Sequence, residues 1–119
     1  MIPITIILHT KDENLMYKGY LSENDNDKTI QYLDENMDTV IVFIGTGQVV
    51  IDRRNSIMDF NAIADSEFEY RTEFGSLVFR LATKALKIEG QRCDIEYSLY
   101  DEYDNLAFTN QLSMEYIKE

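Results

Sequence analysis

The sequence predicts an all-β fold, specifically a single antiparallel up-and-down barrel of about eight to ten strands. Apolar and polar side chains alternate with a period of two, most clearly in residues 93–100 and 106–116. This alternation is typical of strands with one buried face. Short polar turn sequences separate the alternating stretches, and no stretch keeps the period of an amphipathic helix. Together these observations favour a meander of short strands.

Each alternating stretch is bounded by residues that favour tight turns, such as Asn24–Asp27, Gly45–Gly47 and Glu89–Gly90. The stretches that we predict as strands are 2–10, 16–22, 29–35, 39–44, 48–53, 56–61, 67–72, 77–82, 93–100 and 106–116. Residues 12–21 are an alternative helix, but Gly19 and Tyr20 suit a strand better. A sandwich would need at least one long crossover, so the short connections favour a barrel.

The length and charge of the chain restrict the kinds of function that it can have. Its 119 residues fit one domain, 1–119, with no internal boundary. The chain has 22 acidic and 11 basic side chains, a formal net charge of -11. Because nucleic acids and anionic membranes are bound mainly through Lys and Arg, this charge argues against both as partners.

The single cysteine, Cys93, excludes an intrachain disulfide and lies in an alternating apolar run, where a buried thiol is expected. The first eight residues are apolar but lack the basic region and cleavage site of a signal peptide. No apolar stretch is long enough to cross a bilayer. A cytoplasmic location is therefore the expectation.

A series of landmarks resembles a known protein family. The most specific part is Tyr70-x-Thr72-x-x-Gly75-x-Leu77, followed by Thr83 and the Tyr97-x-Leu99 strand. This pattern is similar to that of the YwiB-like family of bacterial proteins, whose fold is described as a calycin-like β-barrel. The resemblance covers nearly the whole chain. It implies the fold and no particular activity.

Hydroxyl groups on the inward face of the predicted barrel mark a candidate ligand pocket, with two arginines at its rim. The residues of this candidate pocket are Arg53, Tyr70, Thr72, Arg80, Thr83 and Tyr97. Buried hydroxyls need partners, which a ligand or trapped water can supply. The alternative is that the tyrosines are packing residues whose hydroxyls bond to neighbouring backbone.

Catalytic and metal-binding arrangements are not expected. One histidine, His9, and one cysteine are too few for a zinc site or a nucleophile system. Two acidic loops, Glu23–Asp27 and Asp101–Asp104, lack the glycine and flanking helices of a calcium loop, and we interpret them as solvated turns. We therefore expect neither a cofactor nor an enzymatic activity.

Two functions remain open. The first is a non-enzymatic module that binds a small, partly apolar ligand inside the barrel or at its mouth, and it requires a cavity of ligand size. The second is an interaction domain, such as a homodimer, that uses an outer sheet face. Candidate residues for that outer face are Ile7, Val78, Tyr100 and Tyr103.

Overall fold

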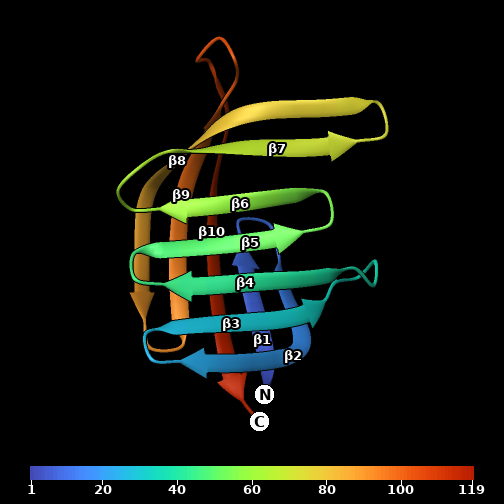
Figure 1. Ribbon diagram of the computed structural model, residues 1–119, viewed down its shortest axis with the longest axis vertical. Helices are drawn as coiled ribbons and strands as arrows, with labels where there is room; N and C mark the ends of the chain where they lie inside the picture. The colour runs from blue at the N-terminus through green and yellow to red at the C-terminus, as the bar shows by residue number, and fades with distance from the viewer.

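The protein is a barrel of ten antiparallel strands without helices, as seen in a computed structural model that describes residues 1–119 (Figure 1). The strands are β1 (Ile2–Thr10), β2 (Asn14–Asn24), β3 (Asp27–Leu33), β4 (Thr39–Gly45), β5 (Gln48–Arg53), β6 (Ser56–Asn61), β7 (Ser66–Thr72), β8 (Gly75–Glu89), β9 (Arg92–Tyr100) and β10 (Leu106–Lys118). All form one sheet in the order β6-β5-β4-β3-β2-β1-β10-β9-β8-β7. The predicted all-β barrel is confirmed.

The sheet folds over on itself, so that two sets of strands cross at a steep angle. Figure 1 shows β3 to β7 running across the front, while β1, β9 and β10 run behind them and β8 passes from one set to the other. The pairing of β8 with β9 is irregular between Thr83 and Ala85. Such a bulge bends a strand, and it allows β8 to turn the corner of the barrel.

A glycine allows β2 and β3 to approach each other closely. Gly19 on β2 is buried, and a Cβ added there would collide with the carbonyl oxygen of Gln31 and lie 2.9 Å from the Ile6 side chain. Only a residue without a side chain lets β2 pass this close to β3. Gly19 therefore belongs to a strand, as predicted, and not to a helix.

The barrel closes between β6 and β7 through isolated contacts, without a regular ladder. The Ser66 hydroxyl donates to the backbone oxygen of Asp59 at 2.7 Å, and the Arg71 amide donates to the oxygen of Asn55 at 3.0 Å. The Asn61 amide donates to the Thr83 hydroxyl at 3.1 Å. These bonds hold the two ends of the sheet together, and the barrel is nearly closed.

The interior is filled by side chains. Twenty buried hydrophobic residues form one cluster to which all ten strands contribute. Ile4, Ile6 and Leu21 are fully buried, and Phe60 reaches Tyr97 on β9 with 4.9 Å between ring centroids. The space that a ligand inside the barrel would need is thus taken up by the protein's own core.

Candidate functional site

Two of the predicted pocket residues, Thr83 and Tyr97, pair with each other across β8 and β9. Tyr97 is buried between Phe60 and Phe108, and its hydroxyl accepts a hydrogen bond from the Asn110 amide group at 3.5 Å. The Thr83 hydroxyl accepts a hydrogen bond from the Asn61 amide at the closing seam, where β6 meets β7 and β8 without a regular ladder. No buried side-chain nitrogen or oxygen lacks a partner. Both hydroxyls are therefore used within the protein.

Tyr70 and Thr72 lie on the β7–β8 hairpin, which extends beyond the core, and both are exposed. The Thr72 hydroxyl donates to the Gly75 oxygen at 2.7 Å and accepts the Phe74 amide at 3.2 Å. Gly75 has a φ of 126°, a conformation that favours glycine. Thr72 thus stabilises the turn.

Arg53 belongs to an aromatic cluster elsewhere on the barrel rim. Burial raises the pKa of Tyr32, and the hydrogen bond and charge of Arg53 oppose that rise. Tyr32 stacks on Tyr17 at 4.8 Å, and the Tyr17 hydroxyl donates to Glu35 at 2.6 Å. Burial, followed by this bond and the Glu35 charge, raises the pKa of Tyr17. No local sequence pattern predicts this cluster, because the stacking of Tyr17 on Tyr32 depends on how β2 and β3 pair.

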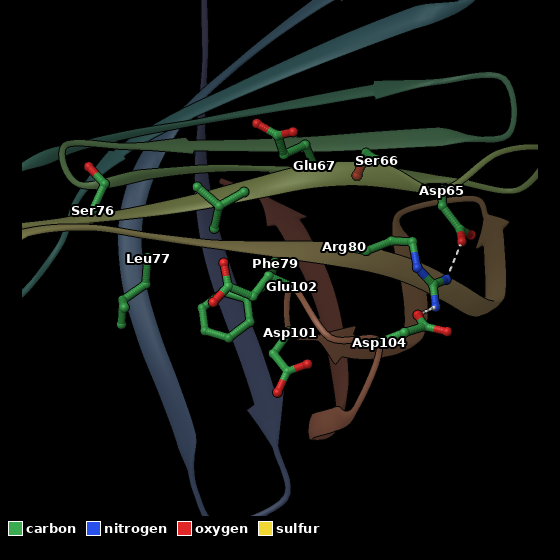
Figure 2. A pocket seen from close by; sticks show the side chains of 11 residues that line it. Asp65, Ser66, Glu67, Ser76, Leu77, Phe79, Arg80, Asp101, Glu102 and Asp104 are labelled. Atoms are coloured by element: carbon green, nitrogen blue, oxygen red, sulfur yellow. Dashed lines mark hydrogen bonds and ion pairs between the residues drawn. The ribbon is translucent and has the colours of Figure 1, made fainter.

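Arg80 points away from the barrel interior, opposite to the inward-facing Phe79 and Leu81. Its guanidinium donates to Asp65 at 2.5 Å and to Asp104 at 2.6 Å (Figure 2). The guanidinium carbon also lies 4.3 Å from the centroid of the Tyr100 ring. The six predicted residues therefore do not line one pocket. Of the six, only Arg80 lines the groove between the β7–β8 hairpin and the β9–β10 loop.

A groove of about 910 Å³ lies between the β7–β8 hairpin and the β9–β10 loop. Its lining residues come from β7, β8, the segment before β7 and the loop after β9: Asp65, Ser66, Glu67, Ser76, Leu77, Val78, Phe79, Arg80, Asp101, Glu102 and Asp104. Figure 2 shows Leu77 and Phe79 pointing to one side of β8, with Asp101 and Glu102 across the groove from that strand. The groove thus has an apolar wall and an acidic wall.

The β8 strand presents a free backbone edge to this groove. β8 begins at Gly75, but its first residue paired with β9 is Arg80, which lies opposite Tyr100. The five residues from Gly75 to Phe79 therefore pair with β7 on one side only. In an antiparallel ladder, alternate residues direct their amide and carbonyl groups to opposite edges, so part of this backbone faces the groove.

The acidic wall is a well-defined loop. The Asp101 carboxylate accepts hydrogen bonds from the backbone amides of Tyr103 and Asn105, both at 2.9 Å. The Asp101 amide in turn donates to the backbone oxygen of Asn105. Asp104 has a φ of 62°, which an aspartate tolerates in such turns. The groove holds five carboxylates and one guanidinium, and its electrostatic potential is therefore negative.

The chain matches the profile of a family described as a domain of unknown function, DUF1934, over residues 5–114. The chain belongs to the DUF1934 family. The fold is similar to that in the crystal structure of the YwiB protein from Bacillus subtilis, with a TM-score of 0.70 and 15% sequence identity. The comparison covers 99% of this chain and 92% of that chain. The predicted YwiB-like resemblance is confirmed, and no curated protein matches.

Within this DUF1934 barrel, sequence reasoning identified Arg80 but missed the groove around it. Two signals were present. Val78 breaks the polar face of its strand, and Asp101, Glu102 and Asp104 crowd one loop. The sequence could not show that the loop lies beside an unpaired edge.

No group of three or more His, Cys, Asp or Glu side chains is arranged to hold a metal ion. No helix is long and apolar enough to span a membrane.

Proposed function

We propose that this DUF1934 protein is a non-enzymatic binding module that takes its ligand in the groove between the β7–β8 hairpin and the β9–β10 loop. The observation that carries the proposal is that groove, whose volume of about 910 Å³ falls within the range typical of ligand sites. The filled interior leaves the groove as the better candidate. The ligand envisaged is small and partly apolar.

The chemistry of the groove suggests the charge of that ligand. Leu77, Val78 and Phe79 offer apolar contacts, and Leu77 and Val78 stay largely exposed in the free protein. A ligand that covers these two side chains would remove their apolar surface from contact with water, which favours binding. Arg80 is neutralised by its two carboxylate partners, so the remaining carboxylates favour a cation. A ligand that combines an apolar group with an amine fits both walls.

The proposal is tested by titrating phenethylamine, a partly apolar amine, and its neutral analogue ethylbenzene against the protein. The variant Val78→Asn removes an apolar contact, and Ile57→Asn on β6 is its matched control because both side chains are 47% exposed. We expect phenethylamine to bind more tightly than ethylbenzene and Val78→Asn alone to weaken it. Equal affinity in the two variants would contradict the location of the site.

A further inference from the structure

Residues 75–79 of β8 pair with β7 on one side and leave their other backbone edge free. An exposed strand edge is a template for another strand, and natural proteins usually cover or blunt it. Here no strand pairs with the edge, and two of its apolar side chains, Leu77 and Val78, are exposed. No proline or lysine interrupts residues 75–79. The edge is therefore competent for strand addition.

The surroundings of this edge define the side chains that an added strand would carry. Leu77 and Phe79 lie on one face of β8, and Val78 lies on the other. Glu67 lies opposite Arg80 on the outer face, and Glu102 belongs to the β9–β10 loop, which forms the acidic wall of the groove. A strand whose residues alternate between apolar and basic would place its apolar side chains beside Leu77 and its cations near the carboxylates.

We infer that the groove binds an extended, basic peptide segment of a partner protein, which adds as a strand to the free edge of β8 between Gly75 and Phe79. This inference rests on the proposed function, since it places in the same groove a longer ligand that carries the same apolar and cationic groups. Backbone hydrogen bonds to β8 supply affinity that does not depend on sequence. The apolar and acidic walls select peptides in which hydrophobic and cationic residues alternate.

A second copy of this chain is the competing occupant, because two free edges can pair with each other. The charge of the surface argues against it. The groove carries five carboxylates and one guanidinium, and the whole chain has a net charge of -11. Like charges facing each other across an interface weaken association. A basic peptide instead gains attraction from the same groups.

The test uses the acetylated, amidated peptide Lys-Val-Lys-Val-Lys-Val-Lys and two N-methylated versions, one methylated at every valine and one at every internal lysine. Because alternate amides of a strand face the same edge, strand addition predicts that only one version loses binding. Amides within residues 75–79 should gain protection from hydrogen exchange when the unmodified peptide binds. If binding comes from charge alone, both versions bind as the parent does and no amide is protected, which overturns the inference.

A pair of charge variants controls for non-specific attraction to this acidic protein. Glu67→Gln with Glu102→Gln removes two groove charges, and neither carboxylate takes part in an ion pair. Asp12→Asn with Asp25→Asn removes two charges from turns outside the groove. We expect roughly three- to tenfold weaker peptide binding for the first pair and little change for the second. An equal effect of both pairs would contradict the site.

The two proposals fail separately. If the peptide does not protect residues 75–79 but phenethylamine binding depends on Val78, strand addition is wrong and the binding module stands. If neither ligand depends on the groove, both proposals are wrong. If the protein is instead a dimer at micromolar concentration and its residues 75–79 are protected without peptide, the second copy is the occupant.

Discussion

The Phe60 ring on β6 packs against the Tyr97 ring on β9, and the two ring centroids are 4.9 Å apart across the barrel. Phe60 is fully buried, and its ring packs from β6, an edge strand of the sheet, onto β9. Both rings belong to the buried core that fills the interior of the barrel. The contact also connects β6, at one edge of the sheet, with β9, and no regular ladder joins these two strands.

Truncating Phe60 should therefore be costly. Phe60→Ala removes a buried ring from the centre of the core, and we expect a loss of about 3–5 kcal/mol in the free energy of unfolding. Tyr97→Phe removes only a hydroxyl with a 3.5 Å contact, and it should cost about 1 kcal/mol or less. Urea unfolding measures both. Similar losses in the two variants would contradict the burial of the Phe60 ring in the core.

The close approach at Gly19 gives a second prediction. Gly19→Ala places a methyl group against the Gln31 carbonyl, and it should destabilise the protein by about 1–3 kcal/mol. Lys18→Ala, at an exposed neighbouring position, is the control and should change stability by less than about 1 kcal/mol. If Gly19→Ala leaves the free energy of unfolding unchanged, β2 and β3 leave room for a methyl group at this position.

The closing seam can be tested through Thr83. Thr83→Val keeps the shape of the side chain but removes the acceptor of the Asn61 amide, at a cost of about 0.5–1.5 kcal/mol. Hydrogen exchange should accelerate at Asn61 and along β6 and β7, while β3 and β4 keep their rates. Unchanged exchange at Asn61 would mean that this bond does not hold the seam.

Cys93 should behave as an inert thiol. Burial is the main cause that raises its pKa, to about 11, and the neighbouring charge of Asp94 adds to the rise. At pH 8 the folded protein should react with a thiol reagent far more slowly than the urea-unfolded protein. The folded form should begin to react appreciably only at more alkaline pH. Equal rates for the folded and unfolded protein would show that the thiol is accessible.

His9 offers a pH-dependent test. Hydrogen bonds from its ring to Asn14 and Glu115, at 2.7 and 3.2 Å, raise its pKa above the usual 6.5. A pKa that is higher in the folded state stabilises the protein below pH 6.5, and that contribution is lost as the pH rises through the folded pKa. NMR titration should show the raised pKa, and Glu115→Gln should lower it. An unshifted pKa in the wild type would contradict the contact.

Much of the fold follows from alternation, because every predicted strand corresponds to an observed one. The main difference is β8, predicted as residues 77–82 but extending to Glu89. Leu81 and Leu86 both face the core side although they are five residues apart, because the irregular pairing at Thr83/Ala85 shifts the pattern by one residue. Sequence alternation stops at such a bulge, while the strand continues.

The site was less predictable than the fold. Tyr97 and Thr83 face inward, as their parity indicates, but their hydroxyls serve neighbouring groups of the barrel. The groove depends on where β9 stops relative to β8 and on how the loop at Asp101 folds back. Both depend on how the strands are aligned with one another, and the alternation of side chains along one strand does not indicate that alignment.

We propose that ligands bind at the free edge of β8 and not inside the barrel. Methyl-resolved NMR of protein labelled at Ile, Leu and Val distinguishes the two locations, with phenethylamine and the basic peptide as ligands. We predict that the methyl signals of Leu77 and Val78 shift with both ligands, while those of the buried Ile6, Leu21 and Ile51 do not. Shifts of the buried methyl groups, with Leu77 and Val78 unchanged, would place the ligand inside the barrel and contradict binding at β8.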